Sequence, residues 1–164
     1  MARTALVLLV VGATGLLLSC GSDAPDGTPS EEPVFTKEGT LTFLRPDDTP
    51  VTTIDIEIAD TDAEREQGLM RRRSLGYDRG MLFVFDTVDE SSMWMKNTPL
   101  PLDIVFVAPD STVINIVERT KPFSLDPIEP EAPKKFVVEV RAGFADRHDL
   151  TDSTRVQWTR TGDS

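Results

Sequence analysis

A polar break between two apolar, strand-like runs is the part of this sequence most suited to chemistry. Lys96, Asn97 and Asp103 lie on either side of a Pro-Leu-Pro sequence. Proline removes a strand hydrogen-bond donor and restricts the residue before it, so we expect the chain to bend between Asn97 and Leu102. Such a bend brings an amine, an amide and a carboxyl group together, as a site for a small polar ligand requires.

Two carboxyl groups in the sequence also suggest a hydrolase. Glycoside hydrolysis uses one carboxyl group as an acid and a second as a base or nucleophile, and Asp103 and Glu139 are the candidates. In a purely structural interpretation, Glu139 forms an ion pair with Arg72, and Asp103 anchors the bent segment, because buried charges are usually paired. The sequence leaves both interpretations open.

Methionine is the candidate metal ligand. Met93 and Met95 share one face of a strand expected over residues 92–96, and thioethers select Cu(I). Methionines more often fill gaps in β-rich cores, so a copper carrier is an alternative rather than the first hypothesis. With His148 as the single histidine and one cysteine in the chain, the usual zinc ligand set is lacking, and we expect no cofactor.

The N-terminus predicts an exported lipoprotein. A basic start precedes an apolar run over residues 5–18, which has the form of a secretory signal and is shorter than the roughly 20 residues of a spanning helix. Leu17-Leu18-Ser19-Cys20 resembles a bacterial lipobox. We therefore expect a lipoprotein signal peptide over residues 1–19, an acyl anchor on Cys20, and a periplasmic or surface-exposed protein of the cell envelope whose partner is the membrane.

Residues 20–33 are rich in Gly, Pro, Ser and acidic residues and have no apolar period, so they predict a disordered tether. The whole chain carries a formal net charge of −11 at pH 7. This charge repels phosphate backbones, so we do not expect nucleic-acid binding.

Residues 34–161 are expected to form a single β-sandwich domain. Apolar and polar residues alternate clearly over residues 51–59, which indicates a strand with one solvated face. Thr61 and Glu64 match a capping box and predict one short helix over residues 62–67. About eight short strands separated by turn residues favour an antiparallel sandwich or barrel. Four prolines make residues 120–133 a long loop.

Four sequence blocks resemble the family known as domain of unknown function 192. They are Gly68-Leu69-Met70 with Arg72 and Leu75, Gly80 to Phe85, Trp94 to Thr98 with Pro101-Leu102-Asp103, and Val138-Glu139-Val140 with Gly143. The resemblance implies a mainly β fold, an antiparallel β-sandwich of jelly-roll type, and no established reaction.

The polar break and the family blocks together predict one ligand-binding site. It would be a groove formed by Arg72, Trp94, Lys96, Asn97 and Asp103, because an aromatic face beside charged and amide groups is typical of such pockets. The leading hypothesis is an envelope lipoprotein that binds a small polar or saccharide-like ligand. The alternatives are a carboxylate-dependent hydrolase, a Cu(I) carrier, and a protein interaction module with no small ligand.

Overall fold

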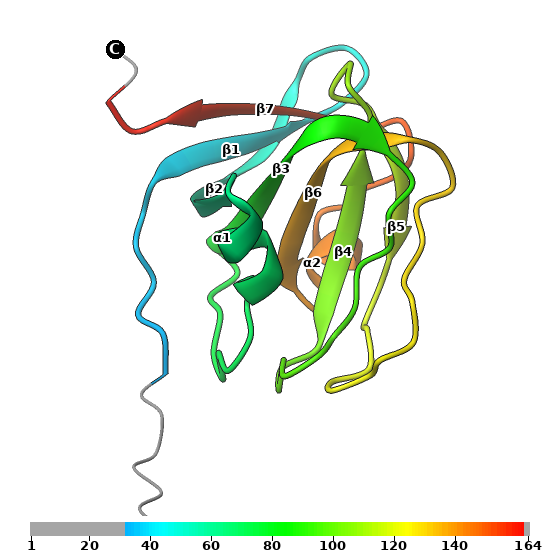
Figure 1. Cartoon of the computed structure of the whole chain (residues 1–164). Helices are drawn as coiled ribbons and strands as arrows, with labels where there is room; N and C mark the ends of the chain where they lie inside the picture. Colours follow the sequence, from blue (N-terminus) through cyan, green and yellow to red (C-terminus); the bar gives the residue numbers. More distant parts are fainter. Residues whose placement is uncertain (1–31, 163–164) are drawn as a thin grey trace, which may run out of the picture. The chain divides into compact units, whose positions relative to one another are not determined.

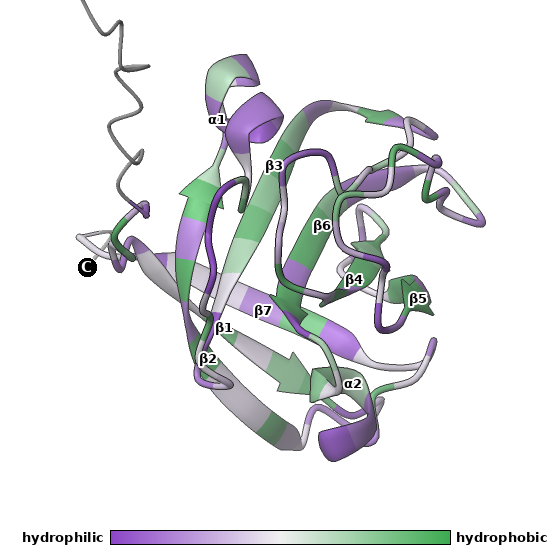
Figure 2. Cartoon of the chain, turned by 90° about the horizontal axis from the view of Figure 1, so that it is seen from below, coloured by the Kyte–Doolittle hydropathy of each residue, from purple (hydrophilic) through white to green (hydrophobic). Residues whose placement is uncertain are grey.

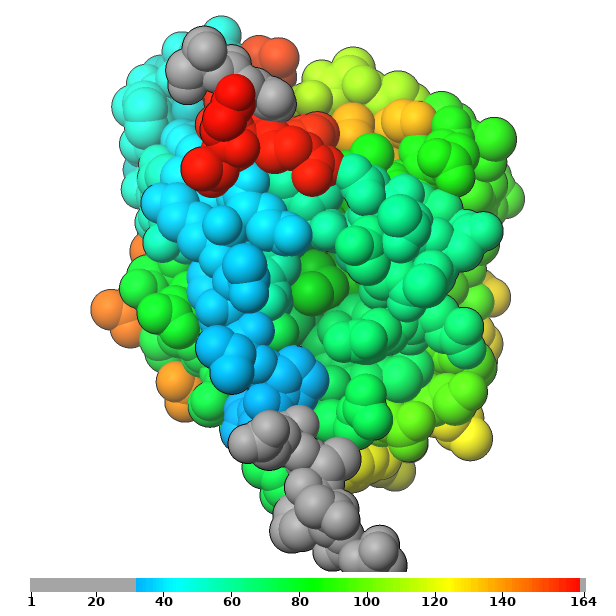
Figure 3. Space-filling model, turned by 60° about the vertical axis from the view of Figure 1, so that its left-hand side comes forward, coloured from blue at the N-terminus to red at the C-terminus, as the bar shows by residue number. Residues whose placement is uncertain are grey.

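The computed structural model describes residues 32–162, which belong to one compact unit. The expected signal peptide, Cys20 and most of the tether lie outside the described residues. Seven strands and two short helices follow in the order β1 (Gly39–Leu44), β2 (Pro50–Ala59), α1 (Asp62–Gln67), β3 (Arg79–Asp89), β4 (Leu102–Val107), β5 (Val113–Val117), β6 (Lys134–Arg141), α2 (Phe144–Arg147) and β7 (Arg155–Arg160). The segment before β1 lies along the surface of the domain (Figure 3).

The strands form a single sheet in the order β5-β4-β6-β3-β2-β1-β7 (Figure 1). The first and last strands of this order meet at one corner, where Thr112 bridges Arg155 and the amide of Val113 donates to the Thr154 carbonyl at 2.8 Å. The sheet therefore curls back on itself. The prediction of a mainly β fold is confirmed.

Two details differ from the expected antiparallel sandwich. β2 and β3 run parallel, because the connection through α1 carries the chain back across the sheet before β3 begins. Residues 92–96 are not a strand, since only Met93 makes an isolated bridge, to Ile128, so the described residues contain seven strands rather than eight.

Both faces of the sheet carry a hydrophobic core. On one face, Phe144 of α2 packs against residues such as Leu82, Val105 and Val138. On the other, side chains from the connections, including Leu69 and Met95, cover a second set of strand residues: Ala59, Met81, Phe83, Leu102, Ile104, Phe106 and Val137. β4 lies between these cores and is buried along its length, as its hydrophobic colouring illustrates (Figure 2).

α1 begins and ends as its sequence predicts. The Thr61 hydroxyl accepts from the Glu64 amide at 3.3 Å, and the Glu64 carboxylate accepts from the Thr61 amide at 2.9 Å, so the predicted capping box is confirmed. Gly68 then turns the chain with φ of 44°, and a β-carbon there would lie 3.0 Å from the Phe83 ring. Glycine thus lets the end of α1 approach β3 closely. Neither helix within residues 32–162 is long and apolar enough to cross a membrane.

Candidate functional site

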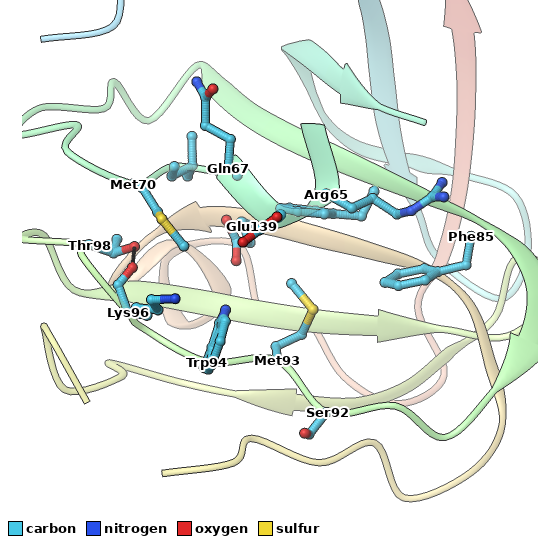
Figure 4. A pocket seen from close by; sticks show the side chains of 14 residues that line it. Arg65, Gln67, Met70, Phe85, Ser92, Met93, Trp94, Lys96, Thr98 and Glu139 are labelled. Atoms are coloured by element: carbon cyan, nitrogen blue, oxygen red, sulfur yellow. Dashed lines mark hydrogen bonds between the residues drawn. The ribbon is translucent and has the colours of Figure 1, made fainter. Parts of the chain in front are cut away.

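A pocket of about 270 Å³ opens between the end of α1 and the segment that follows β3 (Figure 4). β3 and β6 provide its floor. Its walls combine aromatic rings, thioethers and a few polar groups: Met70, Phe83, Phe85, Met93, Trp94, Lys96, Thr98 and Glu139. Such a mixture of apolar walls and few polar groups is usual in small-molecule sites.

Glu139 is the chemically distinctive group of this pocket. It is only 4% exposed, and its carboxyl group makes no hydrogen bond or ion pair with any other residue that the structure describes. Burial raises its pKa to about 8, because the charged form loses its hydration without gaining a partner. At neutral pH the group is therefore mostly a neutral carboxylic acid, able to donate one hydrogen bond and to accept others.

Gly68 makes room above this carboxyl group. A β-carbon at Gly68 would lie 3.9 Å from Oε2 of Glu139 and 3.0 Å from the Phe83 ring. The tight turn after α1 therefore covers the Glu139 carboxyl group, and the missing side chain of Gly68 leaves space beside that group.

Trp94 and Lys96, two of the residues expected at a ligand-binding site, line the pocket. The Lys96 ammonium lies 4.7 Å from the centre of the Trp94 ring, a cation–π contact, and it makes no salt bridge to an acidic residue between positions 32 and 162. Trp94 is 44% exposed. The pocket mouth therefore presents an aromatic face and one uncompensated cation.

The long loop after β5 holds this segment in place. The backbones of Met93 and Ile128 exchange hydrogen bonds of 2.8 and 2.9 Å, and the Met95 amide donates to the Ser124 carbonyl at 3.1 Å. The position of Trp94 between these anchor points is thus fixed by residues some thirty positions further along the chain.

Asn97 lies at the rim rather than in the pocket. The chain turns here, as the prolines predicted: Asn97 adopts φ of 55°, and the Thr98 amide donates to the Met95 carbonyl at 3.1 Å. The Asn97 carbonyl accepts from the Arg71 amide at 2.7 Å, and its side-chain amide lies 3.8 Å from the Met70 sulfur. Asn97 therefore joins the two segments that form the pocket mouth.

Arg72 does not reach this pocket. It is buried and pairs with Glu57, with Nη2 lying 2.7 Å from Oε2. In the sheet, Glu57 is opposite Met81, and Met81 is opposite Glu139, so the two glutamates lie on one face with a methionine between them. The hypothesis that Glu139 pairs with Arg72 is wrong, because Glu57 holds that guanidinium.

Asp103 lies on the opposite face of the sheet. It is fully buried, and its two oxygens accept from the amides of Arg119 at 2.8 Å and Ala145 at 2.9 Å. Asp103 is opposite Val140 and Ile104 is opposite Glu139, so alternation along the strands directs the two carboxyl groups to opposite faces. They do not share a pocket, so Asp103 and Glu139 do not form the carboxyl pair that the hydrolase hypothesis assigned to them.

The two methionines considered as copper ligands have different surroundings. Met95 is fully buried, and its sulfur accepts a hydrogen bond from the Thr120 hydroxyl at 3.2 Å, whereas Met93 lines the pocket. The described part of the chain has no group of three or more His, Cys, Asp or Glu side chains placed to hold a metal ion.

The sequence contained one signal for the importance of Glu139 in this pocket. Its side chain points to the same face as Val137, two residues earlier on a strand in the middle of the sheet. An acidic residue on the apolar face of such a strand requires either a partner or a function. The thioether and phenyl walls had no comparable signal, because Met70, Phe83 and Phe85 come from segments whose meeting only the fold determines.

The family comparison places the chain in a defined group. It belongs to the family DUF192, described as "Uncharacterized ACR", whose model matches residues 42–158. The resemblance noted in the four sequence blocks is thereby confirmed. Among curated proteins, none matches the chain.

Two solved structures are similar to this fold. One is a proposed transcription regulator from Sinorhizobium meliloti 1021, with a TM-score of 0.71 and 33% identity, covering 77% of this chain and 98% of that one. The other is a protein of unknown function from Novosphingobium aromaticivorans DSM 12444, with a TM-score of 0.69 and 34% identity, covering 73% of this chain and 84% of that one.

Proposed function

We propose that the pocket above Glu139 binds a small polar ligand, and that the protein is an envelope lipoprotein anchored through Cys20. The observation that supports the ligand proposal is the buried carboxyl group with no partner in the described chain. A ligand hydroxyl or amide group that bonds to Glu139 would supply the hydrogen-bond partner that the described chain does not.

The pocket walls indicate the kind of ligand. The Trp94 ring offers a flat apolar face, and Lys96 beside it offers hydrogen-bond donors and a positive charge. A ring bearing hydroxyl groups, or a small organic acid, matches this combination of stacking surface and donors. With a volume of about 270 Å³, the pocket suits a ligand about the size of one sugar ring rather than an oligosaccharide.

Binding can be tested with a panel of monosaccharides, polyols and small organic acids, measured by thermal shift and calorimetry. Glu139→Met should lower the affinity for a bound compound at least tenfold, because it keeps the volume and removes the polar group. Glu139→Gln should bind within about threefold of the wild type, because an amide also donates and accepts hydrogen bonds. Lys96→Met should weaken binding, and Lys135→Met, at a half-buried position outside the pocket lining, is its control. Equal affinity of the wild type and Glu139→Met would refute the proposed role of the carboxyl group.

The anchor rests on the sequence around Cys20, the single cysteine of the chain. Cells fed labelled fatty acid should label the wild-type protein and not Cys20→Ala, because this thiol is the acyl acceptor that the lipobox pattern provides. Equal labelling of the variant would contradict the proposed anchor.

A further inference from the structure

Four connections form one end of the domain, here called the basic end. They are residues 70–77, 96–101, 120–125 and 141–147. Backbone hydrogen bonds join them in pairs, from Arg71 to Asn97 at 2.7 Å, from Phe123 to Thr98 at 3.1 Å, and from Ala142 to Pro101 at 3.2 Å. The loops are therefore contiguous in space; the connections that precede β3, precede β4 and follow β5 lie at the lower end of the view in Figure 1, with α2 above them.

The basic end concentrates unpaired positive charge in an acidic protein. Besides Lys96, which lines the pocket beside Glu139, five of its side chains make no salt bridge within the described residues: Arg71, Arg73, Lys121, Arg141 and Arg147. Near this end, Asp146 and Glu118 pair with Arg119, Asp126 accepts from the Ser124 hydroxyl, and Glu32 accepts from backbone amides. Asp78, next to Tyr77, makes no salt bridge within the described residues. None of these carboxylates pairs with the five cations, which leaves them able to bind an external anion.

A hollow in the basic end gives such an anion a place. It has a volume of about 650 Å³, and Arg73, Tyr77 and Arg141 line it. The guanidinium carbons of Arg141 and Arg147 lie 4.8 and 5.0 Å from the centre of the Tyr77 ring. Stacking on this ring orients two guanidinium groups, whose planar forks match phosphate geometry.

Large apolar side chains accompany this charge. Phe123 is 61% exposed and Leu125 is 68% exposed, both on the loop that carries Lys121. Phe123 adopts φ of 61°, an uncommon conformation for an aromatic residue. Exposed aromatic and aliphatic side chains among Lys and Arg are the composition of surfaces that lie at the interface of a membrane.

The chain enters the domain at the same end. Glu32, the first described residue, accepts hydrogen bonds from the amides of Arg73 at 2.8 Å and Ser74 at 3.0 Å. Twelve positions separate Cys20 from Glu32, so the connection spans at most about 40 Å when fully extended. An acyl group on Cys20 would therefore keep the basic end within reach of the bilayer.

We infer that the basic end docks on a bilayer surface rich in anionic phosphate headgroups. A headgroup phosphate occupies the hollow between Arg73 and Arg141, and Phe123 and Leu125 lie at headgroup level. The inference rests on the proposed Cys20 anchor for its reach, and on the charges and exposed apolar residues for its chemistry. Free inorganic phosphate has the same chemistry as a headgroup phosphate, so the test must distinguish these two possible occupants of the hollow.

The test uses full-length, acylated protein in vesicles whose lipids are brominated near the headgroup, a quencher of tryptophan fluorescence. Phe123→Trp with Trp94→Phe and Trp158→Phe places the one tryptophan on the basic end. Trp94→Phe alone leaves Trp158, on β7 at the other end of the domain (Figure 1). In vesicles of equal parts phosphatidylglycerol and phosphatidylcholine, the reporter at position 123 should be strongly quenched and Trp158 should not. Phosphatidylcholine alone should give much weaker quenching at position 123.

Charge variants of the reporter protein supply the second measurement. Arg73→Gln with Arg141→Gln should lower the ratio of docked to free domain about 25-fold, since each basic residue near an anionic surface contributes about fivefold. Arg155→Gln with Arg160→Gln removes the same charge from residues already paired with Asp48 and Asp60, and should leave quenching unchanged. Equal effects of the two pairs, or equal quenching of the two reporters, would overturn the inference.

Two further measurements distinguish a lipid headgroup from free phosphate, and a failure of docking from a failure of the Cys20 anchor. Inorganic phosphate should not reverse the quenching more than chloride does at the same ionic strength; specific reversal, with no difference between the vesicle types, would show a free-phosphate site instead. Mass spectrometry of the same samples reports acylation. Acylated protein with an unquenched reporter would refute docking and leave the anchor intact. Unacylated protein would refute the anchor, and vesicles added to that protein would still test docking through the same reporter.

Discussion

Replacement of Glu139 by glutamine should change how the stability of this protein depends on pH. The carboxyl group is buried without a partner, and its pKa is raised from 4.5 to about 8. Between these two values the folded protein holds a proton that the unfolded chain has released. The wild-type contribution is therefore most favourable below pH 4.5 and is lost progressively as the pH rises to 8.

The magnitude follows from the width of this window. One pKa unit corresponds to about 1.4 kcal/mol, so the free energy of unfolding should fall by about 1.4 kcal/mol per pH unit from this group alone. Over the whole window the loss amounts to no more than about 5 kcal/mol. Glutamine has nearly the same shape and does not titrate. The stability difference between Glu139→Gln and the wild type should be small near pH 4.5, grow up to pH 8, and level off above it.

Urea unfolding of both proteins at closely spaced pH values measures this difference directly, because titration of all other groups cancels. Glu66→Gln removes an exposed carboxylate from the same pocket and controls for the change in charge. Carboxyl NMR of Glu139 gives an independent midpoint. A stability difference that stays constant from pH 5 to pH 8, together with a midpoint below pH 5, would refute the interpretation of Glu139 as a neutral acid.

Three further predictions concern residues that the structure assigns to the fold. Arg72→Met should lower the free energy of unfolding by about 3–5 kcal/mol, because it leaves the Glu57 carboxylate buried and uncompensated; a loss below 1 kcal/mol would show that the pair is solvated. Asp103→Asn should cost about 1–3 kcal/mol, because an amide has one acceptor oxygen for the two backbone amides that the carboxylate holds. This variant should bind pocket ligands as the wild type does, and a selective loss of binding would contradict its placement on the opposite face. Thr61→Ala should cost about 0.5–2 kcal/mol through the lost N-cap of α1, measured by thermal or urea unfolding.

The sequence predicted the strands and the first helix well, because their signals are local. Alternation over β2 and the capping box at Thr61 each depend on neighbours within a few residues. The segment 92–96 was mistaken for a strand, since its residues alternate in polarity as a strand does. Its backbone instead pairs at Met93 and Met95 with the loop at residues 124–128, a contact that alternation does not encode.

The positions of the candidate site residues show the same difference between local and long-range signals. Trp94 and Lys96 lie close to the bend and do line the pocket, whereas Asp103 lies just beyond it and points to the other face. Which face a residue takes depends on strand register, and register depends on the partner strand. The ion pair of Arg72 also depends on the arrangement of the strands. Arg72 pairs with Glu57, not with Glu139, although both glutamates lie on the same face of the sheet.

The contrast between Glu57 and Glu139 is the strongest argument that the pocket has a function. Both carboxyl groups lie on the same face of the sheet, separated across the strands by Met81, and both are largely buried. The fold supplies an arginine to Glu57. It supplies no partner to Glu139 from the described residues, and it leaves a cavity beside that group instead. A residue selected for stability alone would be apolar here, as Val137 is on the same face of β6. This difference between two glutamates on one face of the sheet is the basis of the proposal that Glu139 bonds to a ligand in the cavity.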